Sequence, residues 1–218
     1  MAEKEILELE GFLKEAPLFA EHISSLQEPS LFGTTDGKAI GTYIEAGFRD
    51  WLTNKYVETT GSAAKGIDFP NINVDVKTTK YTQPQSSCPF KNAGQKMYGL
   101  GYHLLVFVYD KTDDAESKSA QLKIKHTIFI DQCQTADYTL TKRTLEMLED
   151  DANDQDLIAY FTDRNLPLDD IGLQNLADRV LASPPEQGYL TISNALQWRL
   201  QYKRAIDVAG DVDGVYAL

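Results

Sequence analysis

The spacing of apolar residues predicts helices towards both ends of the chain. Apolar positions three and four residues apart are typical of helices that bury one face, and Asp36 and Ser193 or Asn194 stand where an N-cap is expected. Pro17 predicts a break, so the first segment forms one acidic helix or two. The expected helices cover residues 3–28, 38–56, 94–102, 140–152, 154–164, 170–182 and 193–207.

Between the helical segments, apolar residues follow strand patterns. Val74 to Thr78 alternates apolar and polar residues, as a half-buried strand does. Leu104 to Tyr109 is continuously apolar, which is typical of a strand buried on both faces. This order of elements predicts an α/β fold with a central mixed β-sheet flanked by helices and a helical C-terminal part. The expected strands lie within residues 66–80, 104–109, 122–130 and 188–192, with a turn at 70–71 and a loop over 81–94.

The segment from Gly66 to Thr79 contains the most specific candidate chemistry. Residues i and i+2 of a strand point to the same side, so Asp75 and Lys77 share a face. Asp68 and Asp75 could hold a divalent cation together with the carbonyl oxygen of Val76. Lys77 would then position or deprotonate a water, or stabilise negative charge on a phosphate. The alternative is a solvated strand face with a surface ion pair, which so short a pattern also fits.

A fourth candidate, Glu45, lies on the expected helix over residues 38–56. Gly41, Glu45, Phe48 and Leu52 fall at i, i+4, i+7 and i+11, which places them on one inward-facing stripe. A carboxylate is costly to bury without a partner. Glu45 therefore either completes the metal site or orients a metal-bound water, or it is a boundary residue that reaches solvent.

Composition limits the class of protein. The chain has 218 residues, of which 42% are hydrophobic and 25% charged, as in ordinary globular proteins. No apolar run approaches the roughly 20 residues of a membrane-spanning helix. The N-terminus lacks the pattern of a secretory signal, and the two cysteines fit neither a disulfide framework nor a zinc site. We therefore expect a cytoplasmic protein with no membrane partner.

The net charge of −12 at first opposes binding to nucleic acids, but its distribution along the chain matters more. Residues 36–109 carry 8 basic and 6 acidic residues, and residues 171–206 carry 4 basic and 2 acidic residues. The acidic excess lies in residues 1–35 and 110–170 and at the C-terminus. This distribution permits DNA binding, while an acidic surface discourages non-specific contacts.

The candidate residues together resemble a known group. A helix glutamate, then Gly-x-Asp, then a strand ending in Asp-x-Lys resembles the PD-(D/E)xK nuclease superfamily, particularly type II restriction endonucleases. Asp68 takes the place of the first aspartate of the motif, Asp75 that of its second acid and Lys77 that of the lysine. Glu45 takes the place of the acid often found on the first core helix. One departure is Ile67, which stands before Asp68 where the motif has proline.

The resemblance covers about residues 38–130 and implies a function. It implies a restriction-endonuclease-like core, with Mg²⁺-dependent hydrolysis of phosphodiester bonds in double-stranded DNA. We expect a nuclease core with N-terminal helices over residues 1–135. The helical region over residues 136–218 is then expected to pack on the core and contribute to DNA contact or dimerisation. A homodimer is expected because two-fold sites match two-fold proteins, and a cognate DNA methyltransferase encoded nearby is the expected companion.

Polar side chains in two segments are candidate DNA contacts. Amides and hydroxyls with interspersed lysines after the motif strand suit contacts to phosphates and base edges. Glutamine and basic residues also recur at helical spacing within the expected helix over 193–207. An ordinary polar loop and a solvated helix face are the alternatives. The candidates are Lys80, Gln83, Gln85, Lys91, Gln95, Gln197, Arg199, Gln201, Lys203 and Arg204.

Two other functions fit the same residues. A DNA-repair or structure-specific nuclease would use the same site on a flap, mismatch or nick. A non-catalytic DNA-binding or interaction protein would use its acidic surface for a protein partner and would bind no metal. Discrete fragments from intact duplex DNA would distinguish restriction from repair, and metal-dependent thermal stabilisation would count against the non-catalytic protein.

Overall fold

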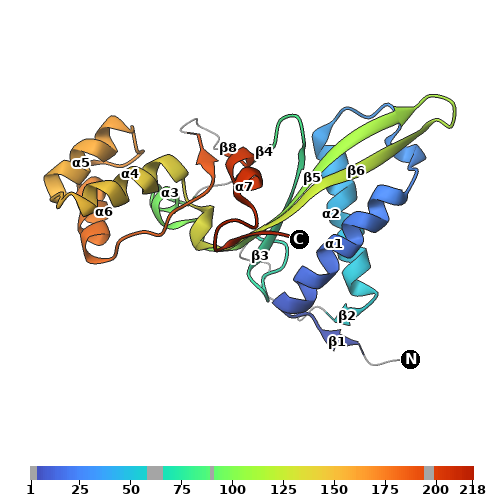
Figure 1. The fold of residues 1–218 in the computed structure, drawn as a ribbon, viewed down its shortest axis with the longest axis horizontal. Helices are drawn as coiled ribbons and strands as arrows, with labels where there is room; N and C mark the ends of the chain where they lie inside the picture. The colour runs from blue at the N-terminus through green and yellow to red at the C-terminus, as the bar shows by residue number, and fades with distance from the viewer. Residues whose placement is uncertain (1–3, 58–65, 89–90, 194–198) are drawn as a thin grey trace. The chain divides into compact units, whose positions relative to one another are not determined.

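The computed structural model of the protein describes residues 4–57, 66–88, 91–193 and 199–218 (Figure 1). The chain divides into two compact units. The first comprises Met1–Pro84, His103–Phe129 and Ala209–Leu218. The second comprises Gln85–Tyr102 and Ile130–Val208. None of the helices formed by the described residues is long and apolar enough to cross a membrane.

The first unit is built on a sheet with the strand order β3-β5-β6-β9. Strand β3 (Val74–Lys80) pairs in parallel with β5 (His103–Asp114). A four-residue turn joins β5 to β6 (Ser119–Ile130), a connection that suits antiparallel neighbours. Strand β9 (Val215–Ala217) lies at the edge beside β6. The predicted mixed sheet is therefore confirmed, although β9 was not predicted.

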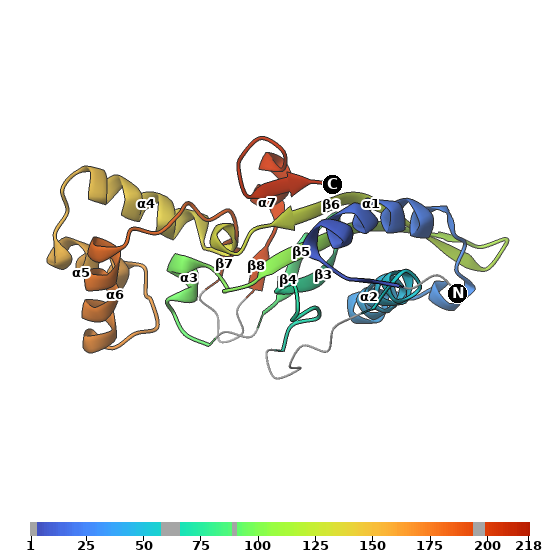
Figure 2. The same ribbon diagram turned by 90° about the horizontal axis from the view of Figure 1, so that it is seen from below.

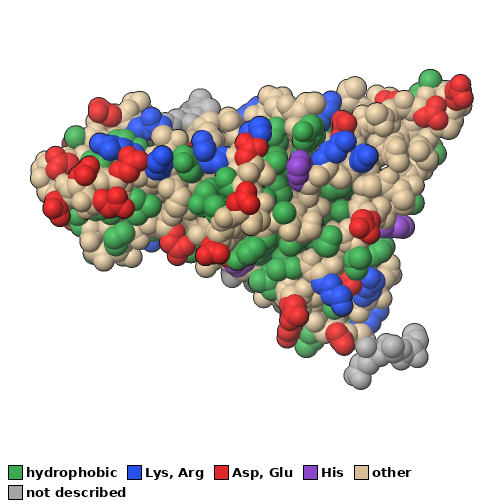
Figure 3. Space-filling model, in the orientation of Figure 1, with side chains coloured by type: hydrophobic (Ala, Val, Ile, Leu, Met, Phe, Trp, Pro, Cys, Tyr) green, Lys and Arg blue, Asp and Glu red, His purple; other side chains and the backbone are tan. Residues whose placement is uncertain are grey.

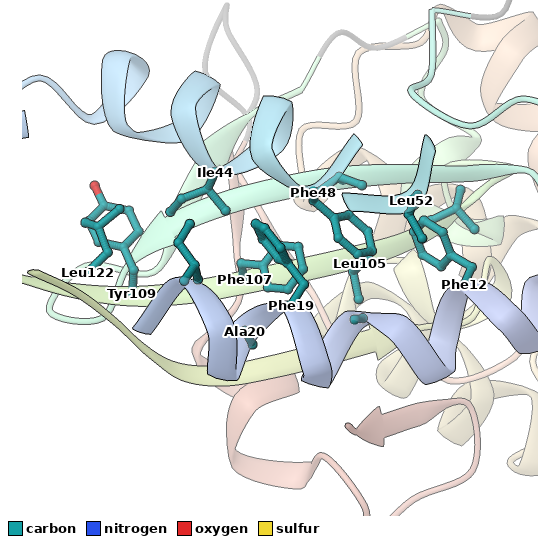
Figure 4. Close-up of a cluster of buried hydrophobic side chains, with 14 of the residues drawn as sticks. Phe12, Phe19, Ala20, Ile44, Phe48, Leu52, Leu105, Phe107, Tyr109 and Leu122 are labelled. Carbon is teal, nitrogen blue, oxygen red and sulfur yellow. The ribbon is translucent and has the colours of Figure 1, made fainter. Parts of the chain in front are cut away.

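Helices α1 (Leu9–Ser25) and α2 (Gly37–Thr53) cover this sheet with an aromatic core. The rings of Phe12 and Phe48 meet edge to face with centroids 5.2 Å apart, and those of Phe48 and Phe107 do the same at 5.2 Å. Figure 4 shows these side chains between the two helices and the strands. The core therefore fixes α2 against the sheet that carries the Asp-x-Lys motif.

The predicted break near Pro17 is wrong, because α1 is continuous through that residue. A proline inside a helix costs about 3 kcal/mol by removing a hydrogen bond and crowding the preceding turn. Phe12, Ala16, Phe19 and Ile23 are buried on either side of it, and their packing outweighs that cost.

Two short strands were not predicted in the first unit. Strand β1 (Glu5–Ile6) pairs in parallel with β2 (Tyr56–Val57), so the N-terminal helix begins at Leu9. A short 3₁₀ helix, η1 (Pro29–Leu31), follows α1. Strands of two residues carry too little periodicity to be recognised from the sequence.

The second unit is mainly helical, as predicted for the C-terminal part of the chain. Its helices pack around a buried cluster that includes Met97, Leu140, Phe161 and Leu176. Helix α4 starts at the Asp137 cap and α6 at the Asp169 cap, while α5 starts with a capping box of Asn153 and Asp156. The helices are α3 (Gln95–Tyr98), η3 (Cys133–Thr135), α4 (Tyr138–Glu149), α5 (Asp154–Asp163), α6 (Asp170–Ala182) and α7 (Lys203–Val208).

The second unit also contains a small antiparallel sheet with the order β4-β8-β7 (Figure 2). Its strands are β4 (Gln85–Ser87), β8 (Arg199–Gln201) and β7 (Thr191–Ile192). The loop predicted over 81–94 and the helix predicted over 193–207 are therefore wrong at these strands. Pairing between segments far apart in sequence decides them, which local composition does not reveal.

Two boundary predictions also need correction. The helix expected over 94–102 ends at Tyr98, because Gly99 adopts a left-handed conformation (φ 82°). Of the described residues within the helix predicted over 193–207, those from Lys203 onward are helical and belong to α7. Ser193 does not act as the predicted N-cap, because its hydroxyl accepts from the N–H of Arg199 on β8 at 3.0 Å, and Asn194 lies outside the described residues.

Candidate active site

A tight turn brings Asp68 alongside strand β3. The backbone N–H of Phe69 donates to the carbonyl of Val74 at 2.9 Å, and the N–H of Val74 donates back to Phe69 at 3.1 Å. Asn73 closes the turn with a left-handed backbone (φ 57°), which asparagine tolerates better than most residues. The Asp68 carboxylate then accepts a hydrogen bond from the backbone N–H of Val76 at 2.9 Å. Asp68 is thereby fixed beside the second half of the motif.

Asp75 and Lys77 form an ion pair on β3, with 2.5 Å between Lys77 Nζ and Asp75 Oδ2. Asp75 is 5% exposed, so its carboxylate is almost fully desolvated. Burial raises the pKa of Asp75 to about 7, with Asp68 adding to the shift and Lys77 opposing it. Burial also disfavours the charged form of Lys77, but the neighbouring carboxylates outweigh it and raise the pKa of this lysine.

Glu45 reaches the same region from helix α2. It is half-buried, and burial followed by repulsion from Asp68 raises its pKa, while the charge of Lys77 lowers it. Gly41, one turn earlier, lets the helix approach β3 closely. A Cβ at Gly41 would lie 4.0 Å from Glu45 Oε1 and 3.8 Å from the Cβ of Thr78. The structure thus brings all four predicted side chains within electrostatic reach of one another.

Arg49 belongs to this site, although sequence reasoning missed it. Its Nη2 donates to the backbone carbonyl of Asp68 at 3.0 Å and lies 3.9 Å from the Asp68 carboxylate. Its guanidinium also stacks on Phe69, 4.8 Å from the ring centroid. Arg49 follows Glu45 by four residues on α2, so the helical spacing that selected Glu45 would also have selected Arg49.

The candidate DNA contacts fall on several elements. Lys80 ends β3 and Gln83 lies in the turn that follows, both exposed. Gln95 is engaged within its own loop, since its Oε1 accepts from the N–H of Lys91 at 2.8 Å and its Nε2 donates to Leu100 at 2.9 Å. These bonds indicate that Gln95 shapes the loop.

The remaining candidate contacts lie near the C-terminus. Arg199 and Gln201 are on strand β8 and do not form the helical face that was predicted. Lys203 and Arg204 open helix α7, with Lys203 paired to Asp207. Gln197 lies outside the described residues.

The described residues contain no group of three or more His, Cys, Asp or Glu side chains arranged to hold a metal ion. What they contain is a pair of neighbouring aspartates, a lysine bound to one of them and a glutamate close to the other. Together with a mixed sheet flanked by helices, these features define a protein of the restriction-endonuclease-like class.

Comparison with known proteins narrows this class. The profile of the family described as type II restriction enzyme NspV matches residues 6–217. A type II restriction enzyme NspV from a Nostoc species is 53% identical over 210 residues, which covers 96% of this chain and 96% of that enzyme. The chain therefore belongs to the NspV family of type II restriction enzymes. The prediction of a restriction enzyme from the Asp-x-Lys motif is confirmed. Among solved structures, none matches the chain.

Proposed function

We propose that this protein cuts both strands of duplex DNA at a specific sequence, in a Mg²⁺-dependent reaction centred on Asp68, Asp75, Lys77 and Glu45. The observation that carries the proposal is the turn that holds Asp68 against the backbone of Val76, beside the Asp75–Lys77 pair. Family membership supports restriction over a repair nuclease or a non-catalytic binding protein.

The oxygen donors of the site suit Mg²⁺. This ion takes a few carboxylate oxygens and keeps several waters, so the carboxylates of Asp68 and Asp75 and the carbonyl of Val76 are a sufficient protein contribution. Burial is the main cause of the raised pKa values of Asp75 and Glu45, and repulsion from Asp68 adds to both, so a bound cation would stabilise their charged forms. A bound cation would supply charge neutralisation at the scissile phosphate and make water a better nucleophile.

Three side chains of the protein would each have a separate role in the reaction. Because its pKa is raised, Lys77 stays protonated, which supports a role as a hydrogen-bond donor to charge that develops on the phosphate. Glu45 would accept a hydrogen bond from the attacking water or complete the set of metal ligands. Arg49 would keep the Asp68 loop in place through its bond to the Asp68 carbonyl.

The proposal also covers the oligomeric state of the protein and the protection of host DNA. Cleavage of both strands at a two-fold site implies a homodimer, to which the region over residues 136–218 would contribute DNA contacts or the dimer interface. Host DNA must also be protected, so a gene for a methyltransferase of the same specificity should lie nearby. Light scattering of the protein with and without duplex DNA would measure the oligomeric state.

The test is cleavage of plasmid and genomic DNA with Mg²⁺ and, separately, with EDTA. Wild type should give discrete fragments with Mg²⁺ and none with EDTA. Lys77→Ala should lose cleavage in Mg²⁺, while Lys123→Ala, an exposed lysine on β6, should cut like wild type. Equal cleavage rates for Lys77→Ala and wild type would overturn the proposed mechanism.

A further inference from the structure

The small sheet of the second unit presents a polar face whose residues come from three separate segments. In its register, Gln85 lies opposite Gln201, and Gln201 lies opposite Thr191. Ser87 lies opposite Arg199 in the same way. Directly opposed residues on adjacent strands share a face of the sheet, as do residues two apart on one strand.

The two faces of this sheet differ sharply in burial. Leu200 and Ile192, which belong to the other face, are 0% and 4% exposed. On the polar face, Arg199, Gln201 and Thr191 are exposed. Strand β7 is also held in place by the backbone N–H of Ile192, which donates to the Asp137 carboxylate at 2.8 Å.

The charge around this face also differs from its surroundings. Residues 130–193 carry 4 basic and 13 acidic residues, and Figure 3 shows acidic side chains gathered over α5 and α6. Residues 199–204 carry Arg199, Lys203 and Arg204 and no acidic residue. Residues 199–204 therefore carry an excess of basic side chains, although Lys203 is paired to Asp207, and this excess suits a polyanion.

We propose that this face reads base edges in the DNA major groove. The inference rests on the proposed function, since it assumes duplex DNA as the substrate. A narrow antiparallel sheet fits the major groove, where glutamine can bond adenine and arginine can bond guanine in bidentate fashion. Gln85 and Gln201 lie directly opposite each other on adjacent strands, and Arg199 is two residues from Gln201 on the same face. On α7, Lys203 is paired to Asp207 and Arg204 lies over the ring of Tyr138, 3.6 Å from its centroid, so base contacts fall to the strand residues.

The experiment selects bound sequences from a library of random duplexes and maps cleavage sites with Mg²⁺ in parallel. The variants are Arg199→Ala, Gln201→Ala and Gln85→Ala. Two exposed residues of the same unit away from the sheet, Arg143 and Gln155, supply the matched controls Arg143→Ala and Gln155→Ala. Thermal melting of each variant checks that the fold is intact.

Each sheet variant should lose discrimination at particular base pairs by about tenfold to a hundredfold, whereas the controls should keep the wild-type site. An unchanged site in all three sheet variants would overturn the inference and leave the proposed function standing. Weaker binding to all sequences alike would also overturn it, because it would mean contacts to the DNA backbone. If wild type selects and cuts no sequence, the proposed function fails and the inference fails with it.

Discussion

The ammonium of Lys77 lies 2.5 Å from the carboxylate of Asp75, its neighbour on the same face of strand β3. The pair is buried enough that neither charge is well solvated, and each therefore depends on the other. Strand geometry alone dictates the contact, because residues i and i+2 point to the same side. Removal of either Asp75 or Lys77 should change both the cleavage rate and the free energy of unfolding. The two effects can be measured separately.

The first prediction concerns Lys77. Lys77→Ala should lower the single-turnover cleavage rate about 10²–10³-fold, the usual cost of removing a donor that stabilises transition-state charge. DNA affinity should change little, because the role proposed for the lysine is at the reacting phosphate. Quenched-flow cleavage together with fluorescence anisotropy would separate the two effects. A large loss of affinity with an unchanged rate would contradict this assignment.

The second prediction concerns the pH dependence of metal binding at Asp75. Its pKa is raised to about 7, so the protonated form predominates below that pH and competes with a cation. Mg²⁺ affinity should therefore fall about tenfold per pH unit below pH 7 if one proton is displaced. Isothermal titration calorimetry between pH 5.5 and pH 8.5 would measure the Mg²⁺ affinity. Repeating the titration in buffers of different ionisation enthalpy would show whether a proton is released.

The free energy of unfolding of the metal-free protein should also depend on the ionisation of Asp75. A carboxyl whose folded-state pKa is raised contributes stability that is fully present below the unfolded value of 3.8 and is lost as pH rises through about 7. Mg²⁺ should therefore raise the melting temperature more at pH 8 than at pH 5.5. Asp75→Asn should abolish the Mg²⁺ effect at both values, and an unchanged effect in that variant would exclude Asp75 as a ligand.

Local rules predicted well the part of the fold that carries the candidate site. Period-two alternation located β3 and a helical stripe located α2, so the amino-acid pattern alone was enough to select Glu45, Asp75 and Lys77. The position of Asp68 beside β3 depends on a further feature, the turn that Asn73 closes. The Pro70–Asn71 pair indicated a turn near this place.

Strands β4 and β8 of the small sheet were not predicted from the sequence, for a physical reason. Arg199-Leu200-Gln201-Tyr202 alternates exposed and buried residues, but four residues also fit a helix. Pairing with β4, far away in sequence, decides between them. The interpretation of residues 136–218 as a region for DNA contact or dimerisation stays a prediction.

The next prediction tests Arg49 as a positioning residue. Arg49→Met keeps an aliphatic chain over Phe69 but removes the 3.0 Å bond to the Asp68 carbonyl. Loss of one such bond should cost about 1–3 kcal/mol of stability and loosen the Asp68 turn.

Mg²⁺ affinity should then fall together with the cleavage rate, a combination that a merely structural role elsewhere would not produce. Arg49→Lys should restore part of both, because the positive charge returns without the planar guanidinium. Titration calorimetry and single-turnover cleavage would measure the two effects. Wild-type Mg²⁺ affinity in Arg49→Met would rule out this role.

The last prediction uses the close approach of α2 to β3 at Gly41. A Cβ there would meet Thr78 at 3.8 Å and Glu45 at 4.0 Å, which are ordinary van der Waals distances. Gly41→Ala should therefore fit and raise the free energy of unfolding by about 0.5–1 kcal/mol, since glycine weakens helices.

Gly41→Leu should have the opposite effect. Its longer side chain must push Glu45 or β3 aside, at a cost of about 1–3 kcal/mol and with a lower cleavage rate. Urea unfolding of the two variants, with cleavage assays on the same samples, would measure both quantities. If Gly41→Ala destabilised the protein as much as Gly41→Leu, α2 would have to lie closer to β3 than the structure places it, and Glu45 would be held nearer to Asp68.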